Sequence, residues 1–278
     1  MNSLVNIEEL GNLLKSQQVM LFDCRFSLQD PAAGRRVYED SHIPGAHFAD
    51  MNKDLSRPHV PGKTGRHPLP SREEWSRTVQ AWGINPDVQV VLYDDAGGAA
   101  AARMWWMLKW LGHANVAVLD GGWQAWLAEG LPVFADTPAA PAATDFSYRD
   151  VKPLATLLTA DQLDANTQVL LDAREPPRFR GEMEPIDPVA GHIPGAFCSP
   201  FSGNLRPDGT FKSPEDLRLK FSTAAQAGKP VVAYCGSGIT ACHNILAMQI
   251  AGLPMPALYA GSWSEWIIDP SRAIATGE

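Results

Sequence analysis

The pentapeptide His42-Ile43-Pro44-Gly45-Ala46 occurs a second time as His192-Ile193-Pro194-Gly195-Ala196, 150 residues further along the chain. Three other stretches recur in the same order around it. They are Asp23-Cys24-Arg25 with Asp172-Ala173-Arg174, VVLYD ending at Asp94 with VVAYC ending at Cys235, and Asp120-Gly121-Gly122-Trp123 with Ala260-Gly261-Ser262-Trp263. Matches that keep one order along the chain indicate that a single structural unit has been duplicated.

The spacing between the matching stretches locates an insertion. It falls from 150 residues at His42 to 141 residues at Asp94. The first copy therefore holds about nine extra residues between these two positions, and we place them in RPHVPGKTGRHPLP, residues 57–70. Because this stretch is rich in proline, glycine and basic residues, it predicts a loop.

Length and composition are those of a folded protein with one large domain or two ordinary ones, and the repeat favours two. The chain has 278 residues, of which 45% are hydrophobic and 19% charged, and its net charge of −8 argues against nonspecific binding to nucleic acids or anionic membranes. Its four cysteines are too few for a disulfide scaffold and form no CxxC pair, so we expect no structural zinc. We read no secretory signal and no membrane span, and we expect a cytoplasmic protein.

Each copy has an α/β pattern. Short apolar runs predict buried strands at residues 19–22, 88–93 and 116–119, and again at 169–171, 231–234 and 257–259. Capping boxes at Asn6 and Thr159 predict helices, and helices at 101–111 and 239–251 stop at glycines. We expect two tandem domains, 1–137 and 153–278, joined by a linker at 138–152, each a mainly parallel sheet with helices on both faces.

The stretch VVAYCGSGITAC, residues 231–242, carries the strongest sign of chemistry. A strand ends at Tyr234, Cys235 follows, two glycines turn the chain and a helix begins near Ile239. In open α/β sheets ligands bind at this edge, where backbone N–H groups and a helix N-terminus favour an anion and a thiolate. The alternative is that Cys235 is a small buried hydrophobe. Cys242, inside the helix, is expected to pack, with a redox role as its alternative.

Three chemistries could use such a loop. Cysteine phosphatases need an arginine six residues after the cysteine, where this chain has Ala241. The pattern Gly236-x-Gly238-x-x-Ala241 formally matches a dinucleotide fingerprint, but no acidic residue closes a second strand about 20 residues later. The third chemistry is sulfur transfer, in which the thiolate takes up a sulfur atom and becomes a persulfide.

These motifs, together with Arg178-Phe179-Arg180-Gly181, resemble the two-domain rhodanese family across nearly the whole chain, and the Cys-Gly-Ser-Gly loop resembles that of 3-mercaptopyruvate sulfurtransferases. The resemblance implies a small anionic donor, 3-mercaptopyruvate or thiosulfate, and a persulfide passed to cyanide, thioredoxin or another thiol, with no metal and no organic cofactor. It implies Cys235 as nucleophile, Ser237 as the group that protonates or orients the substrate, and Arg178 as the anion-binding group. The sulfur-cradling loop would be Gly236, Ser237, Gly238, Ile239, Thr240 and Ala241.

The chain departs from the family pattern near the site. Ile186 stands where mercaptopyruvate enzymes carry a second arginine. His67 fits the family's histidine, but the matching acid aligns with Asn52, with Asp50 next to it. We therefore expect that Arg66 and His67 of the inserted loop reach the site and contribute charge.

The two copies are expected to differ in activity. Asp94 occupies the cysteine position of the first copy, and a carboxylate cannot form a persulfide, so this domain is predicted to be catalytically silent. Arg174 and Arg180 are expected to be structural, in pairs with nearby glutamates. A thiosulfate sulfurtransferase and a non-enzymatic sulfur carrier or redox-regulatory module are the alternative functions.

Overall fold

The computed structural model describes residues 2–16, 19–136 and 138–278, and it divides the chain into two compact units. The first comprises Met1–Arg57, Leu69–Leu154 and Pro207–Phe211, and the second comprises Pro58–Pro68, Ala155–Arg206 and Lys212–Glu278. The expected linker at 138–152 falls in the first unit, where Tyr148 is fully buried. The segment Pro58–Pro68, which lies in the inserted loop of the first repeat, belongs by its contacts to the second unit.

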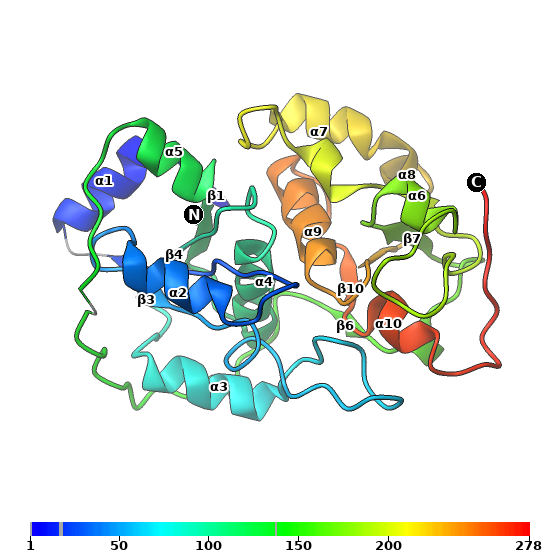
Figure 1. The fold of residues 1–278 in the computed structure, drawn as a ribbon, viewed down its shortest axis with the longest axis horizontal. Helices are drawn as coiled ribbons and strands as arrows, with labels where there is room; N and C mark the ends of the chain where they lie inside the picture. Colours follow the sequence, from blue (N-terminus) through cyan, green and yellow to red (C-terminus); the bar gives the residue numbers. More distant parts are fainter. Residues whose placement is uncertain (1, 17–18, 137) are drawn as a thin grey trace. The chain divides into compact units, whose positions relative to one another are not determined.

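The first unit is built on a parallel sheet of five strands in the order β1-β5-β4-β2-β3. Its strands are β1 (Leu4–Val5), β2 (Val19–Asp23), β3 (His47–Phe48), β4 (Gln89–Tyr93) and β5 (Val116–Leu119). The helices are α1 (Ile7–Ser16), α2 (Ala33–Asp40), α3 (Arg72–Ala81), α4 (Ala101–Leu111) and α5 (Gly122–Ala128) (Figure 1). The capping box at Asn6 forms as expected, and Gly112 ends α4 with φ of 106°.

The second unit repeats this arrangement with strand order β6-β10-β9-β7-β8. Its strands are β6 (Leu157–Leu158), β7 (Val169–Asp172), β8 (Phe197–Cys198), β9 (Val231–Tyr234) and β10 (Ala257–Tyr259). Its α-helices are α6 (Pro176–Phe179), α7 (Pro214–Lys220), α8 (Ser222–Gln226), α9 (Thr240–Ile250) and α10 (Ser262–Trp266), with 3₁₀ turns at Ala160–Gln162 and Phe201–Asn204 (Figure 1). The duplicated parallel α/β fold predicted from the sequence is confirmed.

The helix predicted to begin after Thr159 is not an α-helix in the structure. The capping box at Thr159 forms, but it opens only the 3₁₀ turn Ala160–Gln162 and not an α-helix. The turn stops because Leu163 takes an extended backbone conformation, with φ of −84° and ψ of 129°. A local capping signal therefore fixed the start of the element, while the chain that follows determined its length.

The repeated pentapeptide is a structural motif in both units. Ile43 and Ile193 are buried in the two hydrophobic cores. The His192 ring stacks on Phe179 with centroids 3.7 Å apart, and its Nδ1 lies 2.8 Å from the Phe179 carbonyl oxygen. Gly195 has φ of 78°, a conformation that glycine adopts without the steric cost other residues meet. In the second unit the pentapeptide thus packs its histidine against α6 and its isoleucine into the hydrophobic core.

The interior of the second unit explains where its chemistry lies. All four residues of β7 and every residue from Ala241 to Met248 in α9 are buried, as expected for elements covered on both sides. Because β9 is parallel to both of its neighbours, its carboxyl end lies beside theirs, and α9 starts from that edge. Within the described parts of the chain, no helix is long and apolar enough to cross a membrane.

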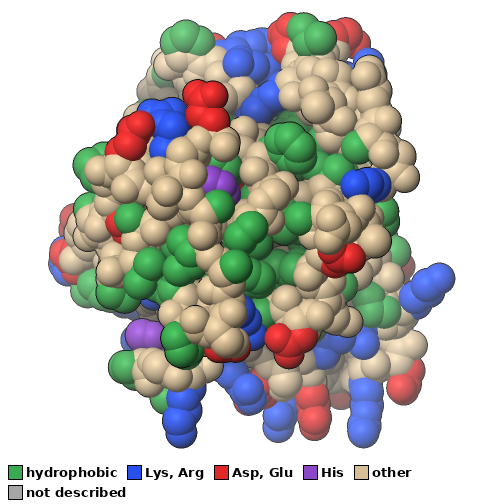
Figure 2. All heavy atoms as spheres, turned by 90° about the vertical axis from the view of Figure 1, so that its right-hand side faces the viewer, with side chains coloured by type: hydrophobic (Ala, Val, Ile, Leu, Met, Phe, Trp, Pro, Cys, Tyr) green, Lys and Arg blue, Asp and Glu red, His purple; other side chains and the backbone are tan. Residues whose placement is uncertain are grey.

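Charged side chains of both signs lie on the surface. On the face in Figure 2, lysine and arginine side chains lie among aspartates and glutamates, with hydrophobic side chains between them. Exposed pairs such as Arg180 with Glu182 belong to this surface. The mixture agrees with the modest negative net charge of the sequence.

Candidate active site

Cys235 directly follows β9, and its thiol faces the turn that leads into α9. The side chain is 2% exposed, and the Gly238 N–H donates to its Sγ at 3.1 Å. Gly238 has φ of 78°, and a Cβ there would stand 2.4 Å from the Ala260 carbonyl oxygen. Only glycine therefore allows the turn to close around the sulfur at this distance from the neighbouring chain.

The start of α10 holds the backbone of Cys235 in place. The Cys235 N–H donates to Ser262 Oγ at 3.1 Å, and the Trp263 N–H donates to the Cys235 carbonyl at 2.9 Å. Ser262 is buried, and it has φ of 56° although it is not glycine. Ser262 is not among the site residues predicted from the sequence. The available signal was that Ser262 aligns with Gly122, so a serine stands where the first copy has the residue suited to this backbone.

Ser237, in the same turn, pairs with His67. Ser237 Oγ and His67 Nδ1 are 2.8 Å apart, and the two side chains are buried. His67 comes from Pro58–Pro68, which is part of the second unit. The inserted loop thus brings a histidine within hydrogen-bond distance of the cysteine loop.

Two guanidinium groups lie over Gly236. A Cβ on Gly236 would stand 2.8 Å from Arg66 Nη2 and 3.6 Å from both Arg178 Nη1 and Nη2. Glu184 holds Arg178 through hydrogen bonds of 3.1 and 3.0 Å to Nε and 2.6 Å to Nη2. Asp187 forms an ion pair with Arg66. The residue after the cysteine is therefore covered by two cations.

Burial acts to raise the pKa of the Glu184 and Asp187 carboxyl groups, and the neighbouring arginines act to lower it. Burial acts to raise the pKa of Glu184, but its hydrogen bonds with Arg178 prevail and the pKa is lowered. Burial also raises the pKa of Asp187, which its ion pair with Arg66 counters. The arginines are thus fixed by acidic side chains that are themselves almost fully buried.

The remaining candidate residues are the end of the cysteine loop, Asp50 and Ile186. Ile239 directly precedes α9, and Thr240 and Ala241 are the first residues of that helix. Asp50, in the first unit, accepts the Asn52 N–H at 2.9 Å and so closes a local turn. Ile186 is 40% exposed.

The residues expected to be structural have local partners. Cys242 is fully buried in α9, and its thiol donates to the Gly238 carbonyl at 3.3 Å. Arg174 forms a buried pair with Asp172 at 2.6 Å, and its guanidinium stacks on Trp263. Arg180 pairs with Glu182 at 2.7 Å.

The first copy shows what the same loop binds when the cysteine is replaced. The Asp94 carboxylate accepts four backbone hydrogen bonds, from Ala96 and Gly98 at 2.8 Å, Ala100 at 2.7 Å and Ala101 at 2.8 Å. Burial raises the pKa of the Asp94 carboxyl, and these N–H groups act against that rise. The loop is therefore a cage of amide donors in which an anionic group fits.

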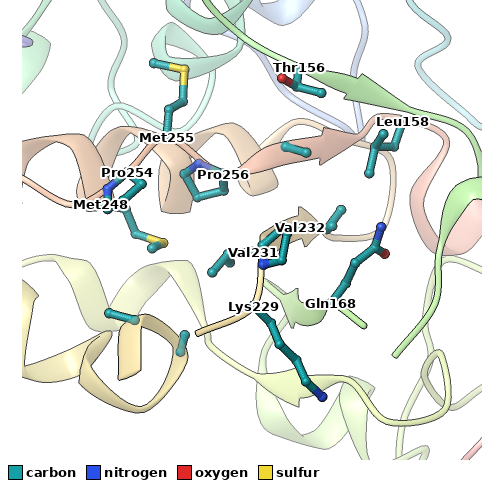
Figure 3. Close-up of a pocket in the computed structure, with 14 residues that line it drawn as sticks. Thr156, Leu158, Gln168, Lys229, Val231, Val232, Met248, Pro254, Met255 and Pro256 are labelled. Atoms are coloured by element: carbon teal, nitrogen blue, oxygen red, sulfur yellow. The ribbon is translucent and has the colours of Figure 1, made fainter. Parts of the chain in front are cut away.

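Two cavities of similar volume lie in the second unit, and only one adjoins the cysteine loop. A cavity of about 450 Å³ is lined by Arg66, Asp187 and Ser264, among others, and the Ser264 N–H donates to the Gly236 carbonyl. The other, about 440 Å³, lies at the amino ends of β9 and β10 and is lined by aliphatic, methionine and proline side chains with Lys229 and Gln168 (Figure 3). Cys235 follows the carboxyl end of β9, so the second cavity lies at the other end of that strand, while the first shares Arg66 with the side chains around Gly236.

Comparison with known proteins agrees with this fold. The rhodanese-like domain profile matches residues 6–129 and 156–269. A probable 3-mercaptopyruvate sulfurtransferase of Pseudomonas aeruginosa is 52% identical over 99% of this chain and 98% of its own length. The thiosulfate sulfurtransferase of Rattus norvegicus is 35% identical over 99% of this chain and 96% of its own length. The solved 3-mercaptopyruvate sulfurtransferase from Leishmania major superposes with a TM-score of 0.85 at 34% identity, covering 95% of this chain and 74% of that one.

A duplicated parallel α/β fold with a caged cysteine at a strand end is the rhodanese architecture, and the chain belongs to the rhodanese family. Within that family it is a two-domain sulfurtransferase, similar over almost its whole length to relatives of that class. The family, the fold class and the enzyme class predicted from the sequence are confirmed.

Proposed function

We propose that the chain moves a sulfane sulfur from 3-mercaptopyruvate, with thiosulfate as the alternative donor, to cyanide or a thiol through a persulfide on Cys235. The single observation that carries this proposal is the surroundings of Cys235. An amide N–H lies on its sulfur, and a serine–histidine pair and two arginines lie around the same short turn. The sulfur is carried covalently, so the proposal needs no metal and no organic cofactor.

The first half-reaction forms the persulfide. The Cys235 thiolate attacks the donor sulfur, an S–S bond forms, and the C–S bond of mercaptopyruvate breaks with its electron pair going to carbon. The carbon fragment then takes up a proton and leaves as pyruvate. In the second half-reaction an acceptor thiolate attacks the outer sulfur and releases the Cys235 thiolate. A small thiol or a protein such as thioredoxin would serve as acceptor.

The amide cage supports a stabilised persulfide. The four residues whose N–H groups bind the Asp94 carboxylate correspond in the repeat to Ser237, Ile239, Ala241 and Cys242. Because the Cys242 N–H donates to the Ile239 carbonyl at 3.0 Å, the amides of Ser237, Ile239 and Ala241 are the ones placed to favour the anionic outer sulfur of a persulfide. The same comparison supports a silent first domain, because there an internal carboxylate fills the cage.

The arginines suit a donor that carries a carboxylate. A guanidinium binds a planar carboxylate through two parallel hydrogen bonds. Arg178 lies beside Gly236, and Arg66 adds a second guanidinium there, where Ile186 provides none. This arrangement favours mercaptopyruvate over thiosulfate. The cytoplasm remains the expected compartment.

Replacing the nucleophile tests the mechanism. With Cys235→Ser we expect no detectable turnover with either donor, because the serine hydroxyl is a far weaker nucleophile at neutral pH. Intact-mass analysis after exposure to donor should show the wild type gaining the mass of one sulfur atom, and the variant gaining none. Cys198→Ser, at a half-buried thiol outside the site, is the matched control and should still gain the sulfur. A sulfur adduct on the Cys235→Ser protein would refute the proposal.

Ser237 and His67 should matter for one donor and not the other. The carbon leaving group of mercaptopyruvate needs a proton, whereas thiosulfate releases sulfite, which is stable as an anion. We expect Ser237→Ala to lower kcat with mercaptopyruvate about 100-fold, the usual scale of proton-transfer assistance, and to change thiosulfate turnover little. Ser202→Ala, at an exposed serine bonded to Glu175, is the control. Equal losses with both donors would contradict a role in protonation.

A further inference from the structure

A single carboxylate lies between the two arginines that cover Gly236. Asp187 is 8% exposed, and its Oδ1 pairs with Arg66 Nη1. Its Oδ2 accepts from Arg178 Nη2 at 3.2 Å. Arg178 is also held by Glu184, while Asp187 is the carboxylate that the structure pairs with Arg66. Asp187 thus links a side chain of Pro58–Pro68 to one that follows β7.

This bridge leaves one N–H₂ group of each guanidinium for another ligand. The carboxylates are bound through Nη1 of Arg66 and through Nε and Nη2 of Arg178. Nη2 of Arg66 and Nη1 of Arg178 are not among these atoms, and they lie 2.8 and 3.6 Å from the point above Gly236 where a Cβ would stand. Two cationic donors therefore converge on one place next to Cys235.

We propose that Asp187 is a positioning residue, which holds Arg66 and Arg178 side by side so that one donor carboxylate takes a hydrogen bond from each. Two guanidiniums at this distance repel each other, and a nearly buried carboxylate between them offsets the repulsion. Without it Arg178 keeps Glu184, but Arg66 loses its acidic partner and turns toward the adjoining cavity. The inference rests on the proposed function and adds to it the residue that determines the donor's charge and shape.

The opposite role would give an opposite result. If Asp187 occupied the place of the donor's carboxylate, it would compete with the donor, and its removal would strengthen donor binding. A positioning role requires that removal weaken donor binding and leave the chemical step almost unchanged, because Cys235, Ser237 and His67 are untouched. The ratio of the effects on KM and kcat therefore separates the two roles.

The test is the steady-state kinetics of Asp187→Asn, which keeps the shape and removes the charge. We expect KM for mercaptopyruvate to rise about tenfold with little change in kcat, as for a lost binding contact. Asp187→Glu should recover part of the loss, which a merely structural role would not predict. Glu182→Gln, at an exposed carboxylate paired with Arg180, is the matched control and should leave KM unchanged. An unchanged or lower KM in Asp187→Asn would overturn the inference.

A double variant and a loading assay complete the design. Arg66→Lys, at a partly exposed side chain that can be changed without disturbing the core, should raise KM similarly, and combining it with Asp187→Asn should add little, since both act on one bridge. Additive effects would contradict the bridge. Intact mass after exposure to saturating donor distinguishes failure of the proposed function from failure of this inference about Asp187. A wild type that gains no sulfur refutes the proposed function, whereas normal loading of Asp187→Asn at low donor refutes only this inference.

Discussion

Asp94 and Cys235 stand at the same position of one duplicated loop, and the backbone around them is held in the same way. The Trp123 N–H donates to the Asp94 carbonyl at 2.8 Å, and the Trp263 N–H donates to the Cys235 carbonyl at 2.9 Å. The difference lies in what fills the cage. In the first copy the internal carboxylate accepts four N–H groups, and in the second the Cys235 thiol accepts the Gly238 N–H.

This difference predicts the cost of removing the carboxylate. Asp94→Ala would leave four buried N–H groups without an acceptor, so we expect the free energy of unfolding of the first unit to fall by about 3–5 kcal/mol. Urea unfolding followed by tryptophan fluorescence measures this, because seven of the nine tryptophans lie in the first unit. Asp87→Ala, at an exposed turn, is the control. A change below about 1 kcal/mol would show that water enters and replaces the carboxylate.

At the scale of the element, the two glycines of the Cys235 turn have different neighbours. A Cβ at Gly238 would meet the backbone oxygen of Ala260 at 2.4 Å, where φ is already 78°. A Cβ at Gly236 would meet the end of the Arg66 side chain at 2.8 Å and would be in ordinary contact, at 3.6 Å, with the end of Arg178. The first contact involves backbone that cannot move without distorting β10, and the second involves a side chain that can rotate.

Alanine substitutions at Gly236 and Gly238 should therefore affect stability and donor binding differently. Gly238→Ala should lower both stability and persulfide formation, because the turn must open. Gly236→Ala should leave stability nearly unchanged but raise KM for an anionic donor, because it displaces Arg66. Thermal unfolding and donor kinetics on both proteins make the comparison. If Gly236→Ala destabilised the protein as much as Gly238→Ala, the distinction between side-chain and backbone crowding would be wrong.

The sequence was sufficient for elements whose signals are local. The strands at 116–119, 231–234 and 257–259 and the helix ended by Gly112 are where apolar runs and glycine placed them. The two-residue strands such as Leu4–Val5 and Phe197–Cys198 were not predicted, because so short a segment has no periodicity and is fixed by its partner.

The same limit applies to the site. Cys235 and its loop were found from a strand, two glycines and a helix in succession, and the inserted loop from the fall in spacing between the repeats and from its composition. Asp187 and Ser262 were not found, because their roles depend on partners far away in sequence, Arg66 for the first and Cys235 for the second. A bridge of that kind has no pattern that a single sequence displays.

At the scale of the whole molecule, the two copies should differ in their response to acid. His113 lies in the first unit, where burial lowers its pKa to about 4. Its Nδ1 lies 2.7 Å from the Tyr148 hydroxyl and its Nε2 3.1 Å from the Asn115 carbonyl, which suits a neutral ring. The equivalent position of the second copy is Leu253, which does not titrate.

The direction of the pH effect on stability follows from the pKa of His113 in the folded chain and that of a histidine in the unfolded chain. An unfolded histidine titrates near 6.5, so between about pH 6.5 and 4 the unfolded chain binds a proton that the folded chain does not. The contribution of His113 to stability is therefore complete above pH 6.5 and is lost as pH falls toward 4, by up to about 3 kcal/mol. His47, whose pKa burial also lowers, acts in the same direction.

Urea unfolding at pH 7 and pH 5 tests this expectation by the same fluorescence signal. His113→Asn should lose less stability between the two pH values than the wild type, although it is less stable at pH 7. His59→Asn, at an exposed histidine, is the control and should behave as the wild type does. Equal losses for His113→Asn and the wild type would show that other groups determine the acid response.

The membership of Pro58–Pro68 in the second unit has a consequence for how the gene can be divided. The segment is encoded within the first repeat, yet it supplies Arg66 and His67 to the cysteine loop of the second. A recombinant fragment beginning at residue 153 would lack Arg66 and His67, so we expect it to transfer sulfur far more slowly than the full chain. Adding a synthetic peptide of residues 58–68 to that fragment would test whether the segment can act without being covalently joined to it.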